Sequence, residues 1–117
     1  MPRFVLLHHD HPHPHLDLML EVEGVLWTWR LSHEPSVGVT QQAQRLGHHR
    51  LAYLDYEGPV SGGRGRVARL DSGLINWVER GDSRAVAELF GGKVRGRLIL
   101  VRQNEEAWEV KLEAGSA

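Results

Sequence analysis

The part of the sequence best suited to chemistry is a cluster of histidines near the N-terminus. Five of the eight histidines lie between His8 and His15. The segment HLDLMLE at residues 15–21 then alternates polar and apolar side chains, which predicts a β-strand. Its period of two puts the three leucines on a core face and leaves four side chains on the other: His15, Asp17, Met19 and Glu21. An imidazole and a carboxylate are therefore expected side by side on one rigid element.

A third ligand is expected from the neighbouring chain. His9 precedes the loop DHPHP at residues 10–14 and would complete a site of two histidines and one carboxylate, with open positions for water or substrate. His11 and His13 lie in this loop with its two prolines, and for them we favour an exposed loop over a ligand role. His15 and Asp17 with a distant His48 or His49 would also suit a non-haem iron oxygenase, an alternative that the residue types leave open.

A second candidate segment is rich in glycine and arginine. Residues 58–66, GPVSGGRGR, could present backbone N–H groups and guanidinium groups to a phosphate. The segment matches neither a P-loop nor a dinucleotide fingerprint, so a plain connecting loop is the simpler interpretation. The four tryptophans lie in apolar runs and are expected in the core or at its rim rather than as platforms for bases: Trp27, Trp29, Trp77 and Trp108.

Length and composition limit the possible classes. The chain has 117 residues and a mass of 13.2 kDa, which predicts one domain over residues 1–113 and a short tail over 114–117. A net charge of −1 argues against coating nucleic acid by bulk charge, although a local basic patch remains compatible with it. The absence of cysteine excludes disulfides, thiolate zinc sites and cysteine nucleophiles. No membrane span or signal peptide is evident, so the cytoplasm is the expected compartment.

Short strand-like runs dominate the rest of the sequence. They fall at residues 3–8, 16–22, 25–31, 66–70, 74–78, 97–102 and 107–112. Turn signals at residues 23–24 and 104–106 predict two antiparallel hairpins. Only residues 41–46 and 83–89 are helical candidates, and both are short. The pattern predicts a mainly β fold, a small antiparallel β-barrel or sandwich with minor helix, and of these we favour the barrel.

Several motifs occur in the order known from one protein family. They are FVLLHHD at residues 4–10, HLDLMLE at 15–21, Gly24-Val25-Leu26 with Trp29, Glu34-Pro35-Ser36, His49 with Tyr53 and the DYEG of residues 55–58, GKVRGRLILVR at 92–102, and WEVK at 108–111. This series covers nearly the whole chain and resembles the 3′-phosphoesterase domain of bacterial DNA ligase D. The resemblance implies a compact, free-standing member of that family.

The resemblance also implies an activity and its residues. A small β-barrel of this kind would bind Mn²⁺, with Zn²⁺ or Co²⁺ as other possible ions, through His9, His15 and Asp17. It would remove a terminal ribonucleoside or a 3′-phosphate from DNA or RNA-containing 3′ ends, with His49 and Tyr53 acting on the phosphate. Such a protein would serve DNA repair and could work with separately encoded ligase or polymerase proteins.

The sequence departs from the family pattern on the phosphate side. Met19 stands where the family has an arginine, His33 where it has a lysine, and Gln41 or Gln42 where it has another arginine. The glycine loop is also shortened. The substrate-binding candidates are therefore Arg30, His33, Arg64 and Arg66, and losing a charge-assisted contact would cost about 2 to 4 kcal/mol. An enzyme and a catalytically reduced module that binds metal and nucleic-acid ends both remain open.

Overall fold

The computed structural model describes residues 1–115 as strands, connecting turns and one short 3₁₀ helix. The tail predicted for residues 114–117 thus lies partly outside the described residues. The elements, in chain order, are β1 (Arg3–His9), β2 (His15–Val22), β3 (Val25–Leu31), β4 (Thr40–His49), η1 (Leu51–Leu54), β5 (Gly58–Pro59), β6 (Arg66–Arg80), β7 (Arg84–Gly91), β8 (Arg95–Arg102) and β9 (Ala107–Glu113).

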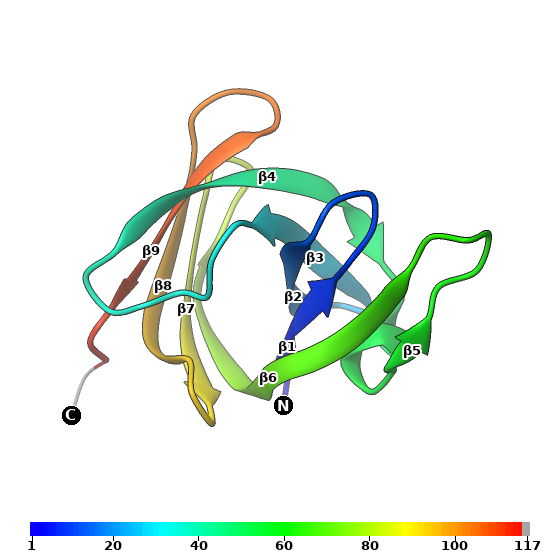
Figure 1. Cartoon of the computed structure of the whole chain (residues 1–117). Helices are drawn as coiled ribbons and strands as arrows, with labels where there is room; N and C mark the ends of the chain where they lie inside the picture. The colour runs from blue at the N-terminus through cyan, green and yellow to red at the C-terminus, as the bar shows by residue number, and fades with distance from the viewer. Residues whose placement is uncertain (116–117) are drawn as a thin grey trace.

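The strands close into an antiparallel barrel (Figure 1). Neighbours follow the order β1-β2-β3-β4-β9-β8-β7-β6, and β6 then pairs with β1 to complete a ring of eight strands. The two-residue β5 adds to the outer side of β6, outside that ring. Closure satisfies the backbone groups that an open sheet would leave unpaired at its edges. The predicted mainly β fold, and the barrel in particular, are confirmed.

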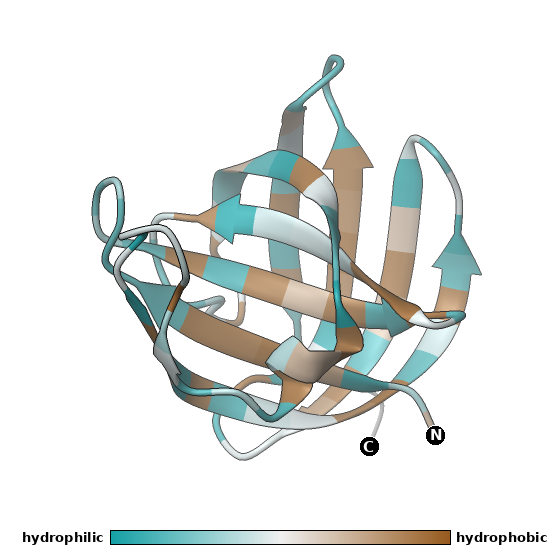
Figure 2. Ribbon diagram, turned by 90° about the vertical axis from the view of Figure 1, so that its right-hand side faces the viewer, coloured by the Kyte–Doolittle hydropathy of each residue, from teal (hydrophilic) through white to brown (hydrophobic). Residues whose placement is uncertain are grey.

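The barrel interior holds the main apolar core. Alternate residues of each strand point inward, so Leu16, Leu18 and Leu20 of β2 pack with Trp29 and Trp108, both of which are buried. Figure 2 shows the resulting alternation of apolar and polar residues along the strands. Trp27 and Trp77 are half-buried against this core. The tryptophans therefore lie where the sequence places them, in the core and at its rim.

A second apolar cluster covers the outer face of β1 and β2. Its members are Val5, Leu7, Met19, Leu26, Leu54 and Val67, with Tyr53 and Val60 packed against them. Met19 is only 1% exposed, and Asp17 on the same face is 4% exposed. The polar face of β2 is thus covered by η1 and the chain around β5 rather than open to water. Burial of this kind raises the cost of any polar group that lacks a partner.

The two helical predictions are wrong. Residues 41–46 lie in β4, and residues 83–89 lie almost entirely in β7. Both segments contain Ala, Leu and Arg, with Gln in the first and Glu in the second, and these residues favour helices only by tenths of a kcal/mol per residue. Pairing with two neighbouring strands on either side outweighs that preference: β4 lies between β3 and β9, and β7 between β6 and β8.

Both predicted hairpins are present. Glu23 and Gly24 form a two-residue turn between β2 and β3, with φ of 44° and 87°. Two successive positive φ values are the requirement of a tight turn that matches strand twist. In the β8–β9 turn, the Asn104 side-chain oxygen accepts a hydrogen bond from the Ala107 N–H at 3.1 Å. The sequence therefore located these two reversals correctly.

The two runs at residues 66–70 and 74–78 form one continuous strand, β6. The buried Asp71 at its centre does not mark a break. Its carboxylate accepts hydrogen bonds from the N–H groups of Gly92, Lys93 and Val94 at 3.0, 3.0 and 2.7 Å. Burial alone would raise the pKa of Asp71, but these backbone hydrogen bonds outweigh it and lower the pKa below its ordinary value. Asp71 therefore fastens β6 to the β7–β8 turn.

Among residues 1–115, no helix has the length and apolar character required to span a membrane.

Candidate metal centre and the adjoining hollow

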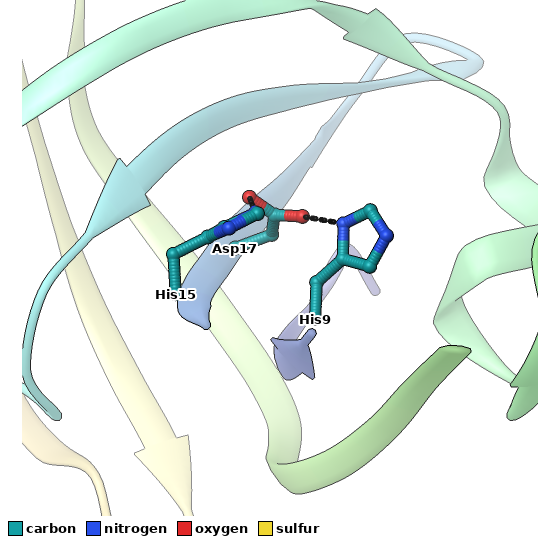
Figure 3. Close-up of side chains that lie close together, drawn as sticks. All are labelled: His9, His15 and Asp17. Atoms are coloured by element: carbon teal, nitrogen blue, oxygen red, sulfur yellow. Dashed lines mark ion pairs between the residues drawn. The ribbon is translucent and has the colours of Figure 1, made fainter. Parts of the chain in front are cut away.

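The two predicted histidine ligands lie opposite each other on the β1–β2 hairpin. His9 pairs with His15 across the ladder, and Asp17 follows two residues later on the same face of β2. Figure 3 shows the three side chains pointing toward one another. One candidate ligand atom from each residue lies within 4.8 Å of the others. The strand register thus brings together the three residues that the sequence predicts as ligands.

The spacing between the ligand atoms is short. His15 Nε2 lies 3.2 Å from Asp17 Oδ1, and His9 Nδ1 lies 3.6 Å from Asp17 Oδ2. Two ligands of a common divalent ion at about 2.1 Å are separated by about 3 Å when adjacent around it. The cluster is therefore close to the dimensions of a metal site.

Each ring is oriented by a backbone carbonyl. His9 Nε2 bonds the Arg64 carbonyl at 2.7 Å, and His15 Nδ1 bonds the His13 carbonyl at 2.8 Å. A carbonyl oxygen only accepts, so these nitrogens carry the protons, and the other nitrogen of each neutral ring presents a lone pair to Asp17. Outer hydrogen bonds of this kind are typical of histidines that bind metals.

The inner atoms of the cluster lack protein partners. His15 Nε2 and Asp17 Oδ1 are buried and have no hydrogen-bond partner among the described residues. Two lone-pair donors and a carboxylate that face each other in a buried place would cost free energy unless a cation or proton lies between them. The donor set, two imidazoles and one carboxylate, suits Mn²⁺, Zn²⁺ or Fe²⁺. The residues therefore fit a divalent metal.

The carbonyl that orients His9 belongs to a loop that Asp10 holds in place. Asp10 Oδ1 accepts a hydrogen bond from the Arg66 N–H at 2.8 Å, and this bond is the main cause of the lowered pKa of Asp10. Gly65, the residue before Arg66, has φ of +77° and packs against Asp10. A Cβ at Gly65 would approach Asp10 Oδ1 to 2.1 Å. Only glycine fits this position. Sequence reasoning missed this positioning role, although Asp10 is part of the His-Asp motif that it singled out.

A hollow of about 90 Å³ adjoins the cluster. It is lined by His9, Asp17, Met19, His49, Tyr53, Val60, Arg64 and Val67. The hollow thus brings two of the three candidate ligands together with His49 and Tyr53. His49 is the last residue of β4, and Tyr53 lies in η1. Their rings meet edge to face with centroids 5.7 Å apart. His49 Nδ1 donates to the Gly47 carbonyl at 2.9 Å, which leaves Nε2 as the free ring nitrogen.

Arg64 is the candidate cation that lines this hollow. Its Nε donates to the Ser61 carbonyl at 2.7 Å and its Nη2 to Ser61 Oγ at 3.1 Å. It forms no ion pair with an acidic residue within the described part of the chain. A guanidinium held by neutral groups keeps its charge and its remaining N–H donors for an anion. Arg64 thus lines the same hollow as Met19, the residue for which the resemblance described above implies an arginine in the family.

The other three substrate-binding candidates lie outside this hollow. Arg30 pairs with Asp17 across the β2–β3 ladder, and it lines a separate hollow of about 350 Å³ with His15. Arg66 lines a third, of about 430 Å³, with His8 and Asp10. His33 is exposed and exchanges two hydrogen bonds with the Gln41 side chain through its backbone. Two of the four candidates therefore share a hollow with candidate ligands. Arg64 does so with His9 and Asp17, and Arg30 does so with His15.

The register separates each pair of adjacent histidines. His9 faces His15, whereas His8 pairs with Leu16 and faces the third hollow. His49 lines the hollow with Tyr53, whereas His48 stacks on Trp27 with centroids 6.1 Å apart. Strand register decides such assignments, because a shift of one residue exchanges the two faces.

Comparison with known proteins identifies related sequences. Residues 7–102 match the family described as the DNA Ligase D 3′-phosphoesterase domain. The chain is 31% identical over 114 residues to the multifunctional non-homologous end joining DNA repair protein LigD of Mycobacterium tuberculosis (strain H37Rv). It is 32% identical over 114 residues to the multifunctional non-homologous end joining protein LigD of Pseudomonas aeruginosa (strain PAO1).

The match covers most of this chain and little of those relatives. It includes 90% of the chain but 15% of the mycobacterial protein, and 87% of the chain but 13% of the Pseudomonas protein. The chain therefore spans about a seventh of the length of these curated relatives.

Proposed function

This chain belongs to the DNA ligase D 3′-phosphoesterase domain family, and on that premise we propose that it is a metal-dependent phosphoesterase that processes 3′ ends of DNA. The observation that carries the proposal is one shared hollow. His9 and Asp17 of the candidate metal centre line it together with His49, Tyr53 and Arg64. A phosphate placed there would meet a metal on one side and donors on the other.

His9, His15 and Asp17 would hold the ion, which we propose to be Mn²⁺. A divalent cation at this place supplies charge neutralisation of phosphate oxygens and a water of lowered pKa. The chain contributes the rigidity of the site, because the Arg64 and His13 carbonyls fix both rings. The second apolar cluster excludes bulk water from the base of the hollow.

The remaining residues would act on the phosphate ester. Arg64 would bind the non-bridging oxygens, since its guanidinium forms no ion pair with a carboxylate among residues 1–115. Water would attack phosphorus, the bond to the leaving oxygen would break, and the Tyr53 hydroxyl, or His49 as an imidazolium, would donate the proton that the leaving oxygen requires. The products would be a phosphate and a free hydroxyl, or a 3′-phosphate end and a released nucleoside.

A second function is supported by Met19. This buried thioether occupies the wall where the family pattern has an arginine. A thioether is at best a weak hydrogen-bond acceptor and carries no charge. If Arg64 does not supply the missing charge, the chain would bind metal and nucleic-acid ends with little turnover, as a reduced module beside separately encoded repair proteins.

Release of phosphate from a 3′-phosphorylated DNA primer–template tests the proposal. Wild type should turn over with added Mn²⁺, while Asp17→Asn should not. Asp55→Asn is the matched control, because Asp55 is exposed, pairs with Arg3 and does not line the hollow. Zn²⁺ and Co²⁺ should be compared with Mn²⁺ in the same assay. Metal binding without turnover would support the reduced module, and turnover without any metal would overturn the proposal.

A further inference from the structure

A fourth hollow opens directly beside the proposed phosphate site. It has a volume of about 210 Å³ and is lined by Arg50, Ala52, Tyr53, Tyr56, Pro59, Val60 and Ser61. Two of these residues, Tyr53 and Val60, also line the hollow that contains His9 and Asp17. The two hollows therefore share one wall, and a ligand that reaches across Tyr53 would occupy both.

We infer that this fourth hollow is a subsite for the base of the terminal nucleotide, the one that the enzyme removes. The inference rests on the proposed function for the position of the phosphate. It goes beyond that function because it assigns recognition of the leaving nucleoside to Tyr56 and Arg50.

The walls have the chemistry that a heterocycle requires. Tyr53 and Tyr56 present rings whose planes meet at 88°, with centroids 6.1 Å apart. Pro59 and Val60 add aliphatic surface. Bases stack on aromatic rings whatever their sequence, because every base has a π face. The hollow is smaller than the roughly 300 Å³ of pockets that hold larger ligands, so its size suits a single base.

Tyr56 is fixed in position before any ligand arrives. Tyr56 is 39% exposed, yet its hydroxyl donates a hydrogen bond to the Pro59 carbonyl. Gly58 leaves room for this contact: its φ is +133°, and a Cβ there would lie 3.2 Å from the Tyr56 oxygen. An exposed aromatic ring whose polar end is already bonded offers its apolar face at a low cost in conformational entropy.

The charge at the rim suits the backbone of a nucleic acid. Arg50 lines the hollow and forms no ion pair with any residue among the first 115. The lining contains no carboxylate. A free guanidinium near an aromatic pocket can bind the phosphate or ribose that accompanies the base.

The terminal base fits this place better than the one before it. A base at the end of a strand has one stacked neighbour, whereas the preceding base has two. Moving a base out of the stack costs least where it is unpaired or at an end. The nucleotide beyond the scissile phosphate can therefore turn into the hollow while the rest of the strand stays stacked.

The test compares three 3′ ends on one DNA primer: a terminal ribonucleotide with a base, the same terminus without a base, and a 3′-phosphate. Tyr56→Ala should raise KM for the terminus with a base about 5- to 150-fold, which is the range for losing one base stack. The other two ends should be processed as by wild type. Tyr56→Leu keeps side-chain volume without the π face, and it serves as the second variant if the alanine variant fails to fold.

A binding measurement separates this inference from the proposed function. Adenosine 5′-monophosphate should bind the metal-free protein more tightly than ribose 5-phosphate, and Tyr56→Ala or Tyr56→Leu should abolish the difference. Arg50→Gln should weaken both ligands equally. That pattern would support the subsite even if no end were hydrolysed. Efficient 3′-end hydrolysis with no preference for a base, in wild type and variants alike, would overturn the subsite and leave the proposed function intact.

Discussion

His9 and His15 face each other across the β1–β2 ladder, and a different backbone carbonyl accepts a hydrogen bond from each ring. The carbonyl of His13 lies in the hairpin loop itself, while that of Arg64 arrives from a loop more than 50 residues later. One ligand is thus oriented locally and the other by tertiary structure. The geometry of the candidate metal centre therefore depends on the loop before β6 as well as on the hairpin.

Metal binding should stabilise the fold. Mn²⁺ at 100 times its dissociation constant should raise the free energy of unfolding by about 2.7 kcal/mol, and Asp17→Asn should abolish the gain. Thermal unfolding with and without Mn²⁺ measures the effect. His8→Ala is the matched control, because His8 faces away from the cluster. Equal stabilisation of wild type and Asp17→Asn would show that Mn²⁺ binds elsewhere.

The loop glycines offer a matched pair for the role of Asp10. Gly63 and Gly65 both have positive φ, at +67° and +77°, so alanine strains the backbone at either place. Only at Gly65 would a Cβ collide with Asp10, since nothing lies within 4 Å at Gly63. Gly65→Ala should weaken Mn²⁺ binding by about 10- to 100-fold through the displaced Arg64 carbonyl. Calorimetric titration should find that Gly63→Ala binds Mn²⁺ much more tightly than Gly65→Ala does. Equal Mn²⁺ affinities of the two variants would contradict the positioning role of Asp10.

Arg64 should matter more for turnover than the other arginines. Arg64→Ala should lower kcat/KM on a 3′-phosphate by about 10²-fold, the loss expected for one donor to a transition-state oxyanion. Arg66→Ala changes charge equally but lies in a separate hollow, so it should have a small effect. Steady-state kinetics of both variants compare them directly. A larger loss in Arg66→Ala would place the phosphate in the third hollow instead.

Restoring the family arginine should increase activity and reduce stability. Met19→Arg places a guanidinium in the wall beside Asp17, and we expect a gain in kcat of about tenfold or more. The buried site should also lose about 1 to 3 kcal/mol of stability from overpacking. Met19→Leu, similar in volume, should show neither change. A folded Met19→Arg variant without a gain would mean that Arg64 already provides the required charge.

Asp71 should control stability in acid. Its folded-state pKa is lowered, so its contribution is present above the ordinary aspartate value of about 3.9 and is lost as pH falls below it. Asp71→Asn should cost about 2 to 3 kcal/mol at pH 7, because the hydrogen bonds lose their charge. Denaturant unfolding measured from pH 7 to pH 2.5 should show that the free energy of unfolding falls less steeply in Asp71→Asn than in wild type. Asp55→Asn, which removes an exposed carboxylate, is the control and should keep most of the stability of wild type. If the free energy of unfolding of Asp71→Asn fell with pH as steeply as that of wild type, this role of Asp71 would be refuted.

The sequence predicted the candidate ligands because they depend on local pattern. The alternation over residues 15–21 sets the faces of β2, and the tight DHPHP loop returns the chain to His9. What the pattern could not show is the cover over the outer face. Burial of Asp17 and Met19 comes from η1 and the chain around β5, whose contacts with β1 span about 50 residues.

Two strands were missed for a related reason. Residues 41–46 and 83–89 have weak helical preference, and their strand state is decided by partners distant in sequence, such as Thr40 with Lys111 and Arg84 with Val101. Asp71 resembled a break between strands because its partners, the amides of Gly92 to Val94, are 21 to 23 residues away. Local pattern located the candidate ligands and the two tight turns, while long-range pairing determined the extent of the strands.

The three candidate ligands come from one hairpin, which bears on the order of assembly during synthesis. His9, His15 and Asp17 lie within nine consecutive residues, so they can meet as soon as the first hairpin leaves the ribosome. The barrel cannot close until β6 has been made, because β1 pairs with it. His49, Tyr53 and Arg64 likewise enter later. The Arg64 carbonyl that orients His9 comes from the loop before β6, so the candidate centre reaches its full geometry only after that loop has been synthesised.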